Sequence, residues 1–157
     1  MKHTKLDKID RKILKNLQNN GRITNVELAQ LAGISAPPCL RRVRALEESG
    51  FIQGYFTKVD PQMLGYGVTV FAQVKLVSQA ETDLKKFEEL VISWPLVREC
   101  HMLAGETDFL LKIVASDWDQ YQNFLTNNLT AAPNVTSVKS SLGIRAAKEE
   151  PGVPIEV

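Results

Sequence analysis

A glycine and two adjacent prolines limit how residues 21–50 can fold. Gly33 ends one stretch of helical spacing, and Ser35 can cap the helix that follows. Pro37 and Pro38 would break a helix in its middle, but in the first turn their missing N–H groups have no intrahelical partner to lose. The prolines therefore mark the start of a helix, and the segment is predicted to form two short helices joined by a tight turn.

Two helices are expected ahead of this turn. Apolar spacing predicts a helix over residues 10–18, with Asp10 as its cap. Thr24 and Glu27 form a capping box that begins a second helix over residues 25–32. The residues expected to face inward from these two helices are Ile9, Ile13, Leu14, Leu17, Leu28, Ala29 and Ala32.

The helix that follows Ser35 is basic. Its predicted buried stripe is Leu40, Val43 and Leu46. Three arginines lie off that stripe: Arg41, Arg42 and Arg44. A basic helix behind a tight turn is the arrangement with which helix-turn-helix domains place a helix in the major groove of DNA. Double-stranded DNA is therefore the first partner that the sequence predicts.

The charges of the chain are divided between its two halves. Residues 1–60 contain 11 Lys and Arg against 6 Asp and Glu, a net charge of about +5. Residues 61–157 contain 8 against 12, a net charge of about −4. A basic first half suits a polyanion, whereas DNA would repel the acidic second half. Two modules with different partners are therefore predicted.

The second half changes its periodicity, which predicts an α+β domain. Strands are expected over residues 68–76, 97–104, 108–115 and 135–144, and helices over residues 81–92 and 117–129. The order β-α-β-β-α-β is that of a ferredoxin-like sheet with its two helices on one face. The other face, which includes Phe71, is bare, and a second copy of the chain is its simplest cover, so a homodimer is expected.

Two stretches of this sequence resemble a known family. The run LDKIDRKILKNLQNNGRITNVELAQLAGISAPPCLRRVRALEESGFIQGY, which begins at Leu6, resembles the DNA-binding domain of the Lrp/AsnC (leucine-responsive, "feast/famine") regulators. The run LAGETDFLLKI, which begins at Leu103, resembles the Gly-x-x-Asp turn of their effector domain. The resemblance covers residues 6–148. One departure is SAPPC, which stands where members commonly have SPTPC or SPSPC.

The resemblance implies a sequence-specific transcriptional regulator whose DNA binding or assembly responds to a small amino acid or a related metabolite. It implies a homodimer that assembles further, to a tetramer or an octamer. An architectural, nucleoid-associated protein that wraps or bridges DNA with little sequence preference is the alternative. The two differ in the ratio of specific to non-specific affinity.

The expected organisation combines the residue patterns with the resemblance. A winged helix-turn-helix DNA-binding domain takes residues 1–60, with a strand and hinge linker over residues 51–66. Within that linker, aromatic and β-branched residues predict a strand or small ribbon over residues 51–60. A ferredoxin-like (RAM-type) effector-binding and dimerisation domain takes residues 67–148. A C-terminal tail over residues 149–157 is expected to be loose or to lie over another subunit.

The candidate DNA-contacting residues lie at the turn and along the basic helix. They are Arg22, Thr24, Asn25, Ser35, Ala36, Pro37, Pro38, Arg41, Arg42 and Arg44. A guanidinium fork suits this task because it can grip a phosphate, or the O6 and N7 atoms of guanine, with two parallel hydrogen bonds. A solvated basic helix face is the alternative interpretation of the arginines.

The candidate effector-binding residues follow from the resemblance, which implies an amino acid bound near the Gly-x-x-Asp turn at a subunit interface. They are Leu103, Ala104, Gly105, Glu106, Thr107 and Asp108. Backbone N–H groups of the turn could hold the carboxylate of the amino acid, and Asp108 could hold its ammonium group. Without the resemblance, Gly105–Asp108 would be interpreted as an ordinary hairpin turn.

Other classes of function find little support in the residues. Cys39 and Cys100 fit no disulfide framework or zinc spacing, and Cys100 and His101 point to opposite faces of one strand. No nucleophile–base pair or phosphate loop stands out, so neither an enzyme, a cofactor nor a metal is expected. The absence of a long apolar run predicts no membrane partner, and reduced thiols suggest a cytoplasmic protein.

Overall fold

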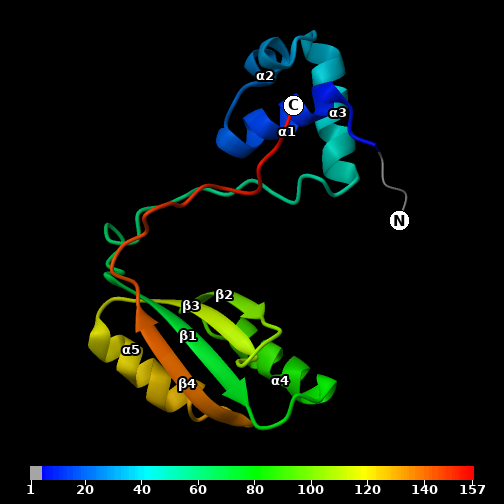
Figure 1. Ribbon diagram of the computed structural model, residues 1–157. Coiled ribbons are helices and arrows are strands. Elements are labelled where there is room, and N and C mark those ends of the chain that lie inside the picture. The colour runs from blue at the N-terminus through cyan, green and yellow to red at the C-terminus, as the bar shows by residue number, and fades with distance from the viewer. Residues whose placement is uncertain (1–4) are drawn as a thin grey trace. The chain divides into compact units, whose positions relative to one another are not determined.

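The computed structural model describes residues 5–157 and divides the chain into two compact units. The first unit, here called the helical unit, extends to Lys58 and also takes in Lys148–Val157. The second, the sheet unit, is Val59–Ala147. Figure 1 shows that the helices of the first half and the sheet of the second belong to separate bodies. Each unit has a hydrophobic core of its own.

Three helices form the helical unit: α1 (Lys8–Asn19), α2 (Asn25–Ala32) and α3 (Ala36–Glu48). The capping box expected at α2 is present, since Thr24 and Glu27 bond each other's backbone N–H. Asp10 was predicted to cap α1, but that prediction was wrong. Asp7 is the cap, and Asp10 completes a capping box with it from the third helical position. Asp10 therefore lies inside the first turn that it was expected to precede.

The turn between α2 and α3 has the predicted form. Gly33 adopts φ +80, a left-handed conformation, and its N–H bonds the carbonyl oxygen of Ala29. Ile34 donates to the same oxygen and packs against the core. Ser35 is the cap residue of α3, although its side chain accepts no capping hydrogen bond. The glycine thus redirects the chain within two residues.

The core of the helical unit corrects the predicted stripe of α3. Ile13, Leu28, Cys39 and Leu46 are buried, with Val43 packed against them. Leu40 was predicted to be buried, but 40% of it is exposed. Cys39, which was expected at a small buried position, is buried, because residues 39, 43 and 46 repeat at helical spacing.

Residues 51–60 were predicted to form a strand, and that prediction was wrong. These residues, all described, are extended but pair with no strand among the residues that the structure describes. Ile52 bonds the carbonyl oxygen of Leu46, and the Tyr55 hydroxyl donates to Glu47 at 2.8 Å. Burial, assisted by this carboxylate, raises the pKa of Tyr55 to about 12. The segment therefore begins attached to α3.

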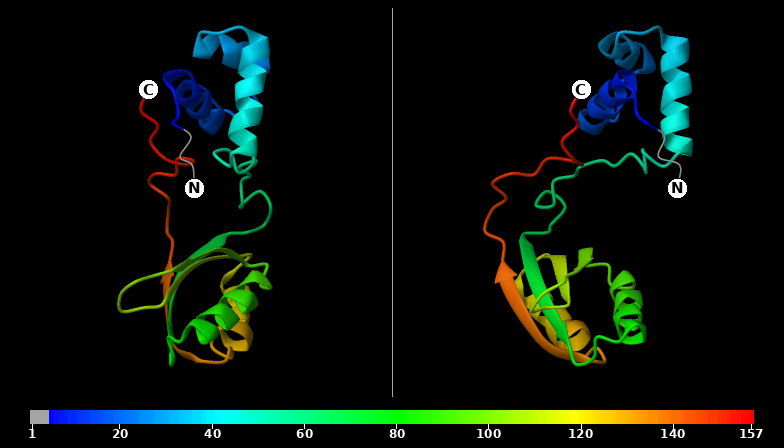
Figure 2. Two further views of the ribbon diagram at one scale, coloured as in Figure 1. Left: turned by 90° about the vertical axis from the view of Figure 1, so that its right-hand side faces the viewer. Right: turned by 45° about the vertical axis from the view of Figure 1, so that its right-hand side comes forward.

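The sheet unit has the predicted β-α-β-β-α-β order. Its elements are β1 (Val68–Leu76), α4 (Glu81–Ile92), β2 (Val97–Met102), β3 (Phe109–Ala115), α5 (Trp118–Phe124) with a π-helical turn (Leu125–Leu129), and β4 (Val135–Leu142). β2 and β4 each end two residues before the predicted limit. The antiparallel sheet has the order β2-β3-β1-β4, and α4 and α5 both cover one face of it (Figures 1 and 2).

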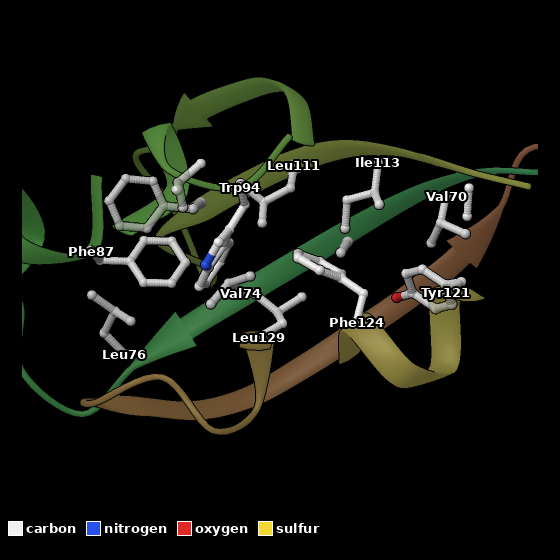
Figure 3. Close-up of a cluster of buried hydrophobic side chains, with 14 residues drawn as sticks. Val70, Val74, Leu76, Phe87, Trp94, Leu111, Ile113, Tyr121, Phe124 and Leu129 are labelled. Carbon is white, nitrogen blue, oxygen red and sulfur yellow. The ribbon is translucent and has the colours of Figure 1, made fainter. Parts of the chain in front are cut away.

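The core of the sheet unit lies between that face and the two helices (Figure 3). Residues Val70, Ala72, Val74 and Leu76 of β1 point into it, as the period of two requires. The rings of Phe87 and Phe109 lie 4.8 Å apart, and Trp94 meets Phe124 edge-on at 5.4 Å. The first contact joins α4 to β3, and the second joins the turn after α4 to α5.

The opposite face of the sheet is uncovered in the single chain. Phe71 is 40% exposed there, and its strand partners are Lys112 and Ser141. A small ion-pair network occupies the β2 edge of this face, where Glu99 lies 2.9 Å from Lys112 and 3.3 Å from His101. The hydrogen bond from Lys112 lowers the pKa of Glu99 most, and the hydrogen bond from His101 lowers it further.

The separate cores of the two units lead to a testable prediction about stability. Ile13→Ala should destabilise the helical unit by about 2–5 kcal/mol, because the fully buried side chain leaves a cavity. The sheet unit shares none of the surrounding core residues and should keep its stability. Hydrogen exchange resolved by peptide measures both units, with Val26→Ala on the exposed face of α2 as the control. Equal loss of protection in both units would contradict independent cores.

Candidate functional site

The exposed face of α3 carries two of the three predicted arginines. Arg41 and Arg44 are exposed, one helical turn apart, with Pro37 and Leu40 exposed beside them. Their guanidinium groups form no ion pair within residues 5–157. The face therefore offers two uncommitted cations on a rigid element.

Arg42 is placed differently, because it is bonded within the helical unit. Its Nη1 lies 2.7 Å from both Asp7 Oδ2 and Asp10 Oδ1. Asp10 and Asp7, in that order, raise the pKa of Arg42. The Asp10 backbone N–H and then the Arg42 side chain lower the pKa of Asp7. The side chain thus ties the middle of α3 to the first turn of α1, where the negative charges also suit the helix dipole.

Most of the other predicted DNA contacts surround the turn. Arg22, Thr24, Ser35 and Pro37 are exposed, whereas Ala36 and Pro38 are half-buried. Asn25 is half-buried, and its amide donates to the Ala36 carbonyl at 2.8 Å. This bond joins the first turn of α2 to the first turn of α3. Asn25 Oδ1 is buried and has no hydrogen-bond partner among the described residues.

The predicted effector turn joins β2 to β3. The Leu103 N–H donates to the Asp108 carbonyl at 2.8 Å and closes the loop. Leu103, Ala104, Gly105 and Glu106 are exposed, and Thr107 is half-buried. The backbone N–H groups of the four residues between Leu103 and Asp108 meet no acceptor in the described part of the chain. The turn therefore presents a row of free donors.

Asp108 is the one charged side chain that is buried among the described residues, with 5% of it exposed. Its Oδ2 accepts from the Leu76 N–H and its Oδ1 from the Gln79 amide, both at 2.7 Å. Its own N–H bonds the Val74 carbonyl at 3.0 Å. Both donors to the carboxylate are neutral, so the carboxylate fastens the turn to the end of β1 without meeting a cation there.

Sequence reasoning missed the partners of Arg42 and Asp108. Gln79 lies 29 positions from Asp108 in the chain, and no local pattern connects them. Asp7 and Asp10 lie at least 32 positions from Arg42. Their capping-box spacing was visible in the sequence, but the spacing does not show that both carboxylates also face α3.

Burial raises the pKa of the thiols of Cys39 and Cys100. Cys39 is buried in the helical core, and burial raises the pKa of its thiol. Cys100 lies on β2, where burial and then Glu88 raise its pKa to about 11. Within residues 5–157, no group of three or more His, Cys, Asp or Glu is arranged to hold a metal, and no helix is long and apolar enough to cross a membrane.

Comparison with known families matches the two parts of the chain separately. A winged helix-turn-helix DNA-binding family covers residues 6–53, and the Lrp/AsnC ligand binding domain covers residues 69–153. The chain belongs to the Lrp/AsnC family of transcriptional regulators. It is thus a DNA-binding transcriptional regulator that carries the ligand-binding domain of that family.

Individual relatives extend the match over almost the whole chain. The leucine-responsive regulatory protein of Rhizobium meliloti is 52% identical over 144 residues, 92% of each chain. The Bkd operon transcriptional regulator of Pseudomonas aeruginosa is 41% identical over 96% of this chain and 98% of its own. A transcriptional regulator of Neisseria meningitidis, solved as its L-Met complex, has a TM-score of 0.91 at 35% identity, over 96% of this chain and 97% of its own.

The Arg42 ion pairs predict a defined pH dependence. A carboxyl group whose pKa is depressed by folding stabilises the fold above its ordinary pKa, here 3.8, and loses that effect as the pH falls through the depressed value. Arg42→Gln should therefore destabilise the helical unit at neutral pH, and the difference from the parent chain should shrink below about pH 4.

Thermal unfolding followed by helical circular dichroism, repeated from neutral pH down to about pH 2, measures this difference. Arg44→Gln is the control, since Arg44 is exposed on the same helix and forms neither of these ion pairs. A difference that persisted unchanged into acid would contradict an electrostatic role for Arg42.

Proposed function

We propose that this Lrp/AsnC regulator binds its DNA sites through α3 and that a small amino acid modulates its DNA affinity or assembly. The observation that carries the effector class is the likeness, over nearly all of both chains, to a regulator solved as its L-Met complex. The free donors of the β2–β3 turn supply the matching chemistry. A regulator of this kind acts on chromosomal DNA, so a cytoplasmic location is part of the proposal.

In the proposed DNA interface, Arg41 and Arg44 contact the duplex. Both side chains are exposed, form no ion pair among the described residues and project from a helix, so each can form two hydrogen bonds to a phosphate or a guanine. The exposed turn residues Arg22, Thr24, Ser35 and Pro37 then lie against the backbone, and Ala36 and Pro38 shape the start of the helix. Arg42 and Asn25 act as positioning residues, because their side chains are already bonded inside the unit.

In the proposed effector site, the free N–H groups of Ala104, Gly105, Glu106 and Thr107 bind the carboxylate of the amino acid, with Leu103 beside them. Such a row of donors attracts an anion without a charged side chain. Asp108 holds the turn in shape, and its negative charge, unmatched by a cation at its hydrogen bonds, favours an ammonium group above the turn.

The proposed assembly begins with a homodimer. The face of the sheet around Phe71 is bare in the single chain, and an exposed aromatic on a half-polar face is more stable when a second copy covers it. Further assembly of dimers into a tetramer or an octamer would give a ligand at the turn a subunit interface to act on. A ligand can shift such an equilibrium only by binding one state more tightly.

The DNA interface is tested by single substitutions on α3. Arg41→Ala and Arg44→Ala should each weaken binding. A lost base contact costs about 1–3 kcal/mol and relaxes specificity, and a lost phosphate contact lowers the salt slope by about 1. Fluorescence anisotropy separates a lost base contact from a lost phosphate contact. It is measured at several salt concentrations on the gene's own upstream DNA and on a scrambled duplex. Arg98→Ala, an exposed arginine of the sheet unit, is the control. Full affinity in both α3 variants would contradict the interface.

The effector site is tested with the same assay across the twenty amino acids. One or two small amino acids should shift the DNA affinity of the parent chain. Asp108→Ala leaves the Leu76 N–H and the Gln79 amide unpaired, so it should abolish that shift while basal DNA binding persists. Asp108→Asn keeps an acceptor and should restore part of the response. A normal response in Asp108→Ala would refute the site, and equal affinity for both duplexes without any response would support an architectural role.

A further inference from the structure

The C-terminal segment Lys148–Val157 belongs to the helical unit, although the chain reaches it from the sheet unit. The side-chain amide of Gln18, on α1, pairs with the backbone of Val153 in both directions. Its Nε2 donates to the Val153 carbonyl at 2.7 Å, and the Val153 N–H donates to its Oε1 at 3.1 Å. Lys58 also lies 2.6 Å from Glu149, an exposed pair that contributes little by itself. The segment is therefore held by a specific two-point contact.

Gly152 is the residue that permits this contact. Its φ is +65, a conformation that side chains disfavour, and a Cβ atom there would overlap the Oε1 atom of Gln18. Gln18 could move away from such an atom only by giving up its bonds to Val153. A side chain at position 152 is therefore incompatible with the paired arrangement.

The residues that follow Gly152 help to line an apolar cavity of about 420 Å³. Val153 and Ile155 line the cavity together with Leu14, Leu17, Phe51 and Ile52. Ile155 is half-buried, whereas its neighbours at the terminus are exposed. Because the cavity leaves part of its lining without contacts, the segment is held less firmly than a packed core element.

The two connections between the units leave the sheet at one place. Val70, near the start of β1, is paired with Leu142, the last residue of β4, and the Gly143 N–H continues the pairing to the Thr69 carbonyl at 2.8 Å. One connection precedes β1 and the other follows β4. The ligand-binding family also matches this chain as far as residue 153, so its matched region includes the docked segment.

We propose that the C-terminal segment is a detachable clasp, an intramolecular ligand for the groove between α1 and residues 51–55. When the segment is docked, the two units are connected twice, once by the chain that precedes β1 and once by the chain that follows β4. Both connections end at the paired strands β1 and β4. A second tie restricts the orientations open to the DNA-binding unit, as any added closure of a loop does. Its docked and released states therefore give an effector two arrangements to choose between.

Two full-length variants open the clasp from opposite sides. Gly152→Val introduces the excluded Cβ on the segment, and Gln18→Ala removes the amide from α1. Glu156→Ala, at an exposed position of the same segment, is the matched control. The first readout is hydrogen exchange of residues 148–157. Both variants should speed exchange of the Val153 amide by at least about tenfold, and the control should not.

The second readout rests on the proposed function. Both variants should retain basal DNA affinity and lose at least about half of the affinity shift that an amino acid produces. Typical allosteric couplings change affinity enough for such a loss to be measured. If the parent chain showed no amino-acid response, the proposed function would fail, and the exchange result would still report on docking by itself.

Three results would overturn the clasp. Unchanged exchange in both variants would mean that the segment is not docked through Gln18. Increased exchange with an intact amino-acid response would mean that docking has no part in coupling. Protection of the Val153 amide that falls when the protein is diluted would assign the docked segment to a second copy of the chain.

Discussion

The pairing of β1 with β3 on one side and β4 on the other is the interaction on which the ligand-binding half depends. The inward residues of β1 form the floor of the core. The end of β1 holds the β2–β3 turn, because Leu76 and Val74 supply bonds that fasten Asp108. Its start pairs with the end of β4, and one connection to the DNA-binding half precedes β1 while the other follows β4. A displacement of this one strand would therefore reach the turn and both connections.

Charge placement separates the arginines of α3 into two kinds. Arg42 faces the two carboxylates at the start of α1 and helps to set the position of the helix. Arg41 and Arg44 face solvent and retain their charge for a partner. A buried or paired guanidinium has already exchanged its hydration for protein contacts, whereas an exposed one can still exchange it for phosphate or base contacts. The proposed DNA interface rests on this difference.

Local periodicity explains what could be predicted from the sequence. The alternation of β1, the helical spacing of α4 and the glycine at position 33 each depend on neighbours within a few residues, and the structure confirms all three. The remaining errors concern which side chains are covered and which strands are paired. Leu40 was expected inside, yet 40% of it is exposed, and residues 51–60 are extended without the partner strand that a ribbon requires. The spacing of apolar residues shows which face of a helix or strand points inward. Only the packing of the folded chain decides which residues at the edge of that face are buried and whether a strand finds a partner.

The sequence by itself determined the order of the elements, the helix-turn-helix and the family, because caps, turns and periods are written in consecutive residues. Tertiary structure alone decided that Arg42 is paired, that Asp108 is bonded to Gln79, and that the C-terminal segment docks against Gln18. The partners in these contacts lie 29 to 135 positions apart in the chain. Such contacts form only after the folded chain has brought the two segments together, so no local pattern specifies them.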